Sequence, residues 1–244
     1  MRGRSRRAVT TVAGLLPLLA FCVTGCGPDA QDRGAPPSGG AAASADARPR
    51  ASSAPPAPRP LTDGQTTSAL IGPSDLAGTW TTTSEDLSPD VEDGDQGIHG
   101  VDGDTACDEV VAASLRAPRS TATVSRTMRQ ATGQSTVGVV VQAYADVEGA
   151  QRQVEQVRQL QQRCSGATVE SWTVEYAAWG TPPRGDDSHG IRMHLAGKRF
   201  DEVVIRVGTA TLTVTFAGTA GDDTALVEAV TARATEKLRS SSTG

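Results

Sequence analysis

The stretch FDEVVIRVGTATLTVTFAG, residues 200–218, decides the fold. Both of its halves place an apolar side chain at every second position, and Gly208-Thr209 separates them. A period of two interrupted by a glycine is typical of antiparallel strands joined by a tight turn. The sequence therefore predicts a hairpin that turns near Gly208 and Thr209. The alternating residues are Val203, Ile205, Val207, Leu212, Val214 and Phe216.

Three segments upstream of the hairpin alternate in the same way and are predicted strands. They are 135–145 (STVGVVVQAYA), 167–177 (ATVESWTVEYA) and 190–197 (GIRMHLAG). In the second of these the alternating residues are Trp172, Val174 and Tyr176. Segment 122–130 (ATVSRTMRQ) is a weaker candidate for a strand.

Two segments have helical spacing instead. Asp146 precedes an amphipathic stretch that runs to Cys164, with Gly166 as its expected C-terminal cap, and a second stretch begins at Asp222 or Asp223. The order is thus strands, helix, strands, helix. This order predicts an α+β fold, an antiparallel sheet with helices packed mainly on one face.

The folded region keeps one pair of cysteines, Cys107 and Cys164. An even pair in an exported chain favours a disulfide, and Cys164 continues the apolar stripe of the predicted helix. Two free, buried thiols are the alternative. A catalytic thiol is disfavoured, because no histidine lies beside either cysteine in the sequence.

The N-terminus has the features of an export signal. Arginines precede an apolar run from Ala8 to Val23 that is shorter than the ~20 residues needed to span a bilayer. The next residues, VTGC, resemble the bacterial lipobox, whose cysteine receives acyl chains such as palmitate. We therefore predict a signal peptide at 1–25 and a lipid-anchored Cys26 on the extracytoplasmic face of the cell membrane. An ordinary signal peptide cut nearby is the alternative, and Sec and twin-arginine export both stay open.

Residues 26–66 are rich in Pro, Ala, Ser and Gly and show no apolar periodicity. Such a segment buries too little apolar surface to fold, so we expect a tether. Residues 67–244 are then one folded domain. The net charge of −5 and the lack of a basic, aromatic-rich stripe argue against nucleic acid as a partner.

Several of these segments together resemble a known family. They are the lipobox, the proline-rich tether, LIGPSDLAG (70–78), the cysteine followed by a short apolar helix (107–115), residues 139–164, and the closing hairpin and helix. The combination is similar to the extracellular sensor domains of mycobacterial PknH-type kinases and related lipoproteins. The resemblance implies an α+β domain with a ligand-binding cleft. This chain departs from the kinases in having no kinase part and one cysteine pair where that domain has two.

The sequence predicts no catalytic residues, no metal site and no cofactor. Nucleophile, zinc and phosphate-loop motifs are missing, and His99, His189 and His194 are dispersed. The acidic segment 84–109 contains DGD twice, which is a feature of calcium loops. It lacks the closing glutamate of an EF-hand, so a solvated loop is favoured and Ca²⁺ binding stays open.

Aromatic and basic residues around a proline-glycine loop give the one candidate ligand site. Trp179 lies at the edge of that loop, and Arg192 and His194 alternate with the apolar residues of the following strand. An aromatic ring with a cation and an imidazole suits a polar or anionic ligand. Trp172, on the opposite side of its strand from Trp179, is expected in the core.

Three hypotheses for function follow. The first is a non-enzymatic, membrane-anchored lipoprotein whose domain binds an unknown small molecule or senses it. The second is an envelope adaptor that docks another surface protein, and the third is an unrecognised hydrolase. An exposed apolar patch would favour the adaptor, and a converging nucleophile and base would favour the hydrolase.

Overall fold

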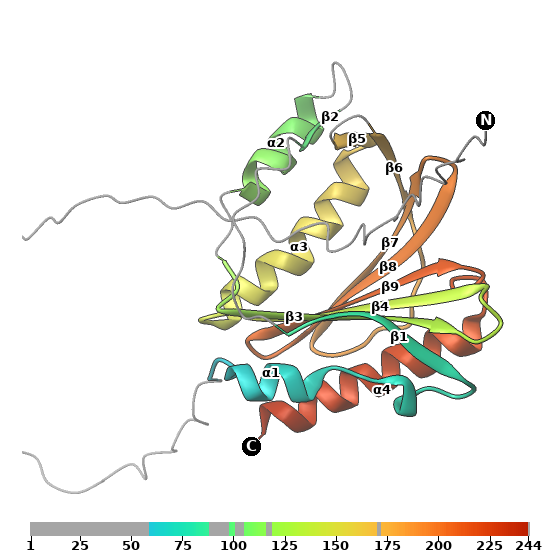
Figure 1. Ribbon diagram of the computed structural model, residues 1–244. Coiled ribbons are helices and arrows are strands. Elements are labelled where there is room, and N and C mark those ends of the chain that lie inside the picture. The colour runs from blue at the N-terminus through green and yellow to red at the C-terminus, as the bar shows by residue number, and fades with distance from the viewer. Residues whose placement is uncertain (1–58, 88–97, 101–104, 116–118, 170–171, 244) are drawn as a thin grey trace, which may run out of the picture. The chain divides into compact units, whose positions relative to one another are not determined.

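Nine antiparallel strands form one sheet in the part of the chain that the computed structural model describes, residues 59–87, 98–100, 105–115, 119–169 and 172–243 (Figure 1). Side chains are described at all of these positions except 98–100, 114–115, 169 and 172. The strand order is β1-β3-β4-β9-β8-β7-β6-β5-β2. The strands are β1 (Trp80–Asp86), β2 (Ile98–Gly100), β3 (Ala122–Gln130), β4 (Ser135–Ala143), β5 (Gly166–Val169), β6 (Trp172–Ala178), β7 (Asp187–Leu195), β8 (Lys198–Val207) and β9 (Ala210–Gly218).

The predicted hairpin is confirmed as β8 and β9 at the centre of this sheet. Val207 lies opposite Ala210, and Gly208 between them has φ of 57°, in the left-handed region that glycine adopts at little cost. Residues 201–205 of β8 are all buried, so this strand is covered on both faces. The apolar alternation of 200–218 therefore marks the middle of the fold.

The helices begin at the residues that the capping pattern predicts. Asp146 accepts a hydrogen bond from the Gly149 amide (2.8 Å) at the start of α3, and Asp223 accepts one from Leu226 (3.0 Å) at the start of α4. Both caps satisfy amides that would otherwise lack a partner. The helices are α1 (Asp63–Ala69), α2 (Thr105–Leu115), α3 (Val147–Arg163) and α4 (Thr224–Ser242), with a short 3-10 turn at Pro73–Asp75.

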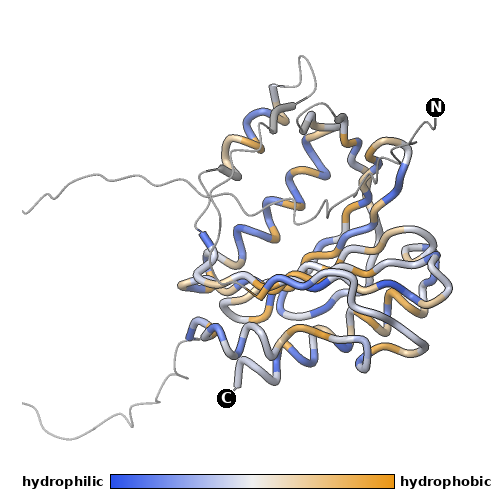
Figure 2. Tube along the Cα trace, viewed as in Figure 1, coloured by the Kyte–Doolittle hydropathy of each residue, from blue (hydrophilic) through white to orange (hydrophobic). Residues whose placement is uncertain are grey.

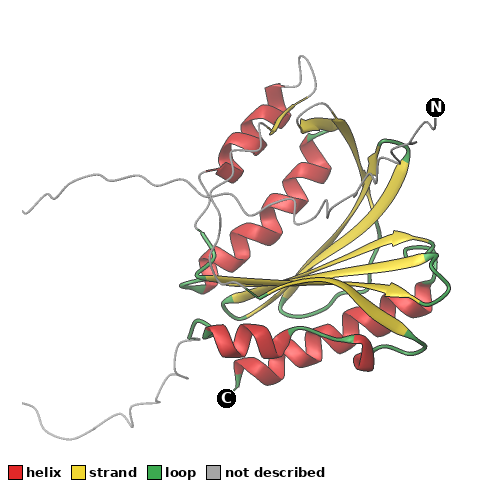
Figure 3. Cartoon of the chain, viewed as in Figure 1, coloured by secondary structure: helices red, strands yellow, loops and turns green. Residues whose placement is uncertain are grey.

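Helices pack on both faces of the sheet, which corrects the prediction that they lie mainly on one (Figure 3). Val203 and Ile205 of β8 pack in a core with Val230 of α4, whereas Val204 packs with Val154 of α3. Adjacent strand residues point to opposite faces, so the two cores lie on opposite sides. In Figure 2 the turns of α3 and α4 alternate between hydrophobic and hydrophilic, as expected for helices with one buried side. The α+β class itself is confirmed.

The predicted strand 167–177 is in fact two strands. β5 and β6 pair with each other, and Val169 lies opposite Trp172. Gly166 is likewise no helix cap, because α3 ends at Arg163 and Gly166 begins β5. A Cβ on Gly166 would lie 2.7 Å from the Val174 carbonyl oxygen, so this glycine permits the close approach of the two strands.

The folded region begins before the predicted residue 67. The Arg59 carbonyl accepts a hydrogen bond from Thr209 (2.9 Å), and Leu61 is part of the core between the sheet and α4. Asp75 then pairs with Lys237 (2.9 Å) and Arg233 (3.0 Å) of α4. Burial raises the pKa of Asp75, but a hydrogen bond from the Gly72 amide and these two cations outweigh it and bring the pKa to about 2. Residues 59–79 therefore belong to the domain.

Candidate functional site

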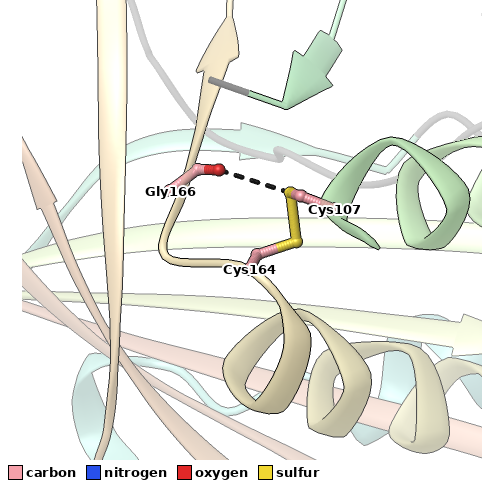
Figure 4. The surroundings of a disulfide bond; sticks show 3 residues. All are labelled: Cys107, Cys164 and Gly166. Atoms are coloured by element: carbon pink, nitrogen blue, oxygen red, sulfur yellow. Dashed lines mark hydrogen bonds between the residues drawn. A yellow bond between two sulfur atoms is a disulfide. The ribbon is translucent and has the colours of Figure 1, made fainter. Parts of the chain in front are cut away.

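Cys107 and Cys164 form the disulfide that the sequence predicts (Figure 4). The bridge joins α2 to the residue after α3, across a sequence separation of 57, with the two Cα atoms 4.6 Å apart. Both cysteines are buried beside Val110, Val157 and Leu160, and Cys107 Sγ lies 3.3 Å from the Gly166 carbonyl oxygen. This bridge connects α2 to the α3 side of the sheet.

Trp179 and Arg192, two of the three residues nominated for ligand binding, are engaged inside the fold. The Trp179 ring packs edge-on against Phe216, with the ring centroids 5.9 Å apart. Arg192 pairs with Asp201 through two hydrogen bonds, of 2.5 and 3.2 Å. Phe216 lies opposite Asp201, so Trp179 and Arg192 share the α4 face of the sheet. They contact neighbouring protein groups there.

His194 lies on the same face as Arg192, because the two are separated by one residue of β7. Unlike Arg192, His194 is exposed. The structure thus brings the three nominated residues to one face, with two of them held in structural contacts. Their part in ligand binding stays a prediction. The prediction that Trp172 lies in the core concerns a side chain that is not described.

The acidic residues Asp201 and Glu202 are adjacent on β8 and are both buried. Asp201 is fully buried on the α4 face, where Arg192 of β7 binds both of its oxygens and Arg199 Nε lies 3.1 Å from Oδ2. Arg199 also reaches Asp222 at 2.8 Å, in the loop that leads to α4. The charge of Asp201 is therefore compensated by two guanidinium groups.

Glu202 has no such compensation among the described residues. It lies on the opposite face, under α3, with 3% of its surface exposed. The Thr215 hydroxyl donates one hydrogen bond to Glu202 Oε2 (3.2 Å), and no described cation pairs with the carboxylate. Burial raises the pKa of Glu202 to about 7, although the Thr215 hydrogen bond opposes the rise.

Tyr176 of β6 is the ionisable neighbour of Glu202. It packs against the core beneath α3, and burial and then the charge of Glu202 raise the pKa of Tyr176 to about 12. The phenol is therefore neutral and can donate a hydrogen bond. Strongly perturbed pKa values are more common at functional sites than elsewhere, which makes Glu202 the candidate site residue.

Sequence reasoning missed Glu202, although a signal was present. The pair Asp201-Glu202 lies in a predicted strand directly before three apolar residues in a row, at 203–205. Alternation alone places one acid on each face, and a buried acid needs a partner. The sequence could not say which of the two acids would obtain a cation, because the partners come from β7 and from the start of β8.

Metal binding finds no support in the described part of the chain. No group of three or more His, Cys, Asp or Glu lies close enough to hold an ion there. His189 is half-buried near Arg158 and Asp187, and burial and then the charge of Arg158 lower its pKa. The side chain of His99 and most of the acidic segment 84–109 lie outside the described residues, as does Cys26.

The fold defines an α+β domain with an antiparallel sheet between helices. No family model matches the chain, and no curated protein matches its sequence. Among solved structures, the extracellular domain of PknH from Mycobacterium tuberculosis is similar. The TM-score is 0.52 and the identity 14%, and the match covers 75% of this chain and 98% of that domain. At this identity the likeness concerns the fold, and it confirms the PknH-like fold expected from the sequence.

No helix in the described residues is both long and apolar enough to cross a membrane.

Proposed function

We propose that this chain is an extracytoplasmic lipoprotein, anchored through acylated Cys26, whose folded domain binds a small ligand without turning it over. The observation that carries ligand binding is Glu202, a buried carboxyl with no ionic partner in the described residues. A group of this kind destabilises the folded protein unless something else compensates it. A ligand that satisfies Glu202 would explain why the chain holds an acid at this position.

The likeness to an extracellular kinase domain supports the location and the sensory type of function. That protein's domain is extracellular, and the fold similarity covers most of the folded region of this chain. The export signal and the VTGC sequence are independent features that favour the same location. Fold similarity alone does not transfer a ligand, so the ligand must be argued from the residues of this chain.

The described surface favours ligand binding over an adaptor role. Leu87 is the one large hydrophobic residue there that is exposed, with 43% of its surface accessible. Docking surfaces of stable complexes usually present several such residues in one patch. A hydrolase is disfavoured because no serine or cysteine nucleophile with an adjacent base appears among the described side chains.

Native mass spectrometry of the full-length protein, extracted from its own membranes in a non-ionic detergent, tests this function. We expect a small molecule to be retained and to be released unchanged on denaturation. The matched control is Glu202→Gln, which we expect to lose that molecule. If the wild-type protein converts the molecule to a product, the function is catalysis and not binding. Melting temperatures measured with fractions of the cell envelope give a second test. If the wild-type protein retains no molecule and no fraction shifts its melting temperature, the proposed function is wrong.

A further inference from the structure

Glu202 lies at the border between a fully buried and a half-buried part of the α3 face. Its neighbours across and along the strands, Ile191 and Val204, are fully buried. The next row toward the β7–β8 turn contains Tyr176, Met193 and Phe200, which lie opposite one another and are half-buried. Glu202 therefore lies one row from two aromatic rings and a flexible methionine that are partly accessible to solvent.

The surroundings of Glu202 complement a cation better than a neutral group. The carboxylate can only accept hydrogen bonds, and in apolar surroundings its charge is attracted strongly to a positive group. Aromatic faces such as those of Tyr176 and Phe200 also attract ammonium groups. We propose that this position binds a small ligand that carries a protonated amine, with Glu202 as its counter-ion, an inference that rests on the proposed ligand-binding function.

The geometry favours an ammonium over a guanidinium or a metal ion. The Thr215 hydroxyl already occupies Glu202 Oε2, so a bidentate pair with a guanidinium would compete with it. Where this chain does bind guanidinium groups, at Asp201, both carboxylate oxygens take part. A divalent ion needs several oxygen ligands, and one carboxylate does not supply them. An ammonium is a compact charge with three donors and requires no such fork.

Binding of a cation at Glu202 should be coupled to loss of a proton. The carboxyl, whose pKa is about 7, is largely protonated at pH 6 and must ionise to act as a counter-ion. Tyr176 stays neutral below its pKa of about 12, and the pKa of His189 is lowered, so neither gains a charge between pH 7 and 8. Other charged groups on this face include Lys198 of β8, which is exposed, Arg206 of β8, Asp187 of β7, and Glu155 and Arg158 of α3.

Benzylamine and benzyl alcohol are a suitable pair of probes, since they have the same ring and differ in charge at pH 8. Isothermal titration calorimetry with the full-length protein should give an affinity at least about tenfold higher for the amine, the range expected for a hydrogen bond to a charged group. The affinity should fall about tenfold at pH 6, with about one proton released per ligand. Glu202→Gln should remove both the preference for the amine and the proton release while preserving the fold.

Equal binding of the two probes to the wild-type protein, or an unchanged amine preference in Glu202→Gln, would overturn this inference. A pH dependence that persists in Glu202→Gln would overturn it too, since His189 would then be the titrating group. The proposed function fails in a different way. If native mass spectrometry finds a retained molecule without an amine, and Glu202→Gln retains it equally, the ammonium site is wrong while ligand binding stands.

Discussion

Asp201 and Glu202 are consecutive residues of β8, equally withdrawn from water, and yet only Asp201 is bound by arginines. The difference follows from the alternation of side chains along a strand. Arg192 lies opposite Asp201 on β7, and Arg199 is two residues before it on β8, so both guanidinium groups are on the α4 face. Glu202 faces α3 instead, with Thr215 as its described hydrogen-bond partner. Asp201 is therefore held by two ion pairs, whereas no described ion pair holds Glu202.

The first prediction is that Asp201→Asn destabilises the domain. The change leaves Arg192 and Arg199 without their shared carboxylate, and breaking a buried pair typically costs about 3–5 kcal/mol. Since 29% and 27% of the two arginine side chains are exposed, we expect roughly 2–3 kcal/mol in urea unfolding. The control is Asp222→Asn, whose side chain is 66% exposed and which should cost under about 1 kcal/mol. Equal losses for the two variants would contradict a special role for Asp201.

The second prediction concerns Glu202→Gln and pH. The raised pKa means that the folded protein holds the Glu202 proton up to about pH 7, whereas an unfolded glutamate loses it near pH 4. The contribution of Glu202 to stability therefore decreases as the pH rises from about 4 to 7 and stays low above that. Glu202→Gln keeps the shape and removes the ionisation, so it should stabilise the ligand-free protein at pH 8, by up to about 3 kcal/mol.

Chemical denaturation of wild-type protein and Glu202→Gln at pH 5 and pH 8 checks this prediction. At pH 5 the two free energies of unfolding should differ by less than about 1 kcal/mol, because the wild-type carboxyl is then protonated in the folded state and only the unfolded chain is ionised. A difference between the two proteins that is the same at both pH values would show that Glu202 does not titrate in this range.

Many local features of this fold could be read from the sequence, although the β5–β6 turn and the role of Gly166 could not. Apart from the Cys107–Cys164 bridge, its long-range contacts could not be read. Alternation placed the turn near Gly208, and capping placed the helix starts at Asp146 and at Asp222 or Asp223, because each of these depends on neighbours in the chain. The distribution of helices over two faces depends instead on which side of the sheet each connecting segment places its helix. The same holds for the α4 contacts of Asp75, which is 162 residues from Lys237 in the chain. No local pattern encodes such a pairing.

The candidate site shows the same division. Arg192 points away from Ile191 and Met193, as alternation predicts. Its partner Asp201 comes from the neighbouring strand, which alternation within one strand does not show. Trp179 follows β6 at the edge of the loop, as expected, and its ring contacts Phe216 of β9. Glu202 could have been identified as an acid directly before the apolar run 203–205. Its lack of a cation became visible only once the side chains of β7 and β9 were in place.

A third prediction is that Trp179→Ala destabilises the domain as well as any ligand complex. The ring packs edge-on against Phe216 and adjoins the core beside α4, so its removal leaves a partly filled space. Since Trp179 is only half-buried, the loss should be about 1–3 kcal/mol, below the 3–5 typical of a fully buried aromatic residue. Thermal unfolding measures it. Trp179→Phe, which keeps an aromatic contact, should recover part of the loss, and a Trp179→Ala protein as stable as the wild type would contradict the packing.

A fourth prediction is that the Cys107–Cys164 bridge contributes to stability rather than to redox chemistry. In the chain-entropy model, closing a loop of 57 residues stabilises the fold by up to about 4 kcal/mol. The double variant Cys107→Ala/Cys164→Ala should therefore unfold at a lower urea concentration and keep its β-sheet content by circular dichroism. Denatured, unreduced wild-type protein should show no reactive thiol at either position, and labelling of both would remove the bridge.

The last prediction is that Cys26 carries the membrane anchor. Acyl chains contribute about 0.8 kcal/mol per buried CH₂, and two or more chains hold a protein stably on a bilayer where one does not. Cys26→Ser should therefore move the protein from the membrane fraction to the soluble fraction, and from the detergent phase to the aqueous phase. Cys22→Ser is the matched control, because Cys22 lies within the predicted signal peptide and its loss should leave the mature protein unchanged. If Cys26→Ser still fractionates with the membrane as the wild type does, while Cys22→Ser behaves no differently, the anchor is not an acylated Cys26, and the lipoprotein part of the proposed function is wrong.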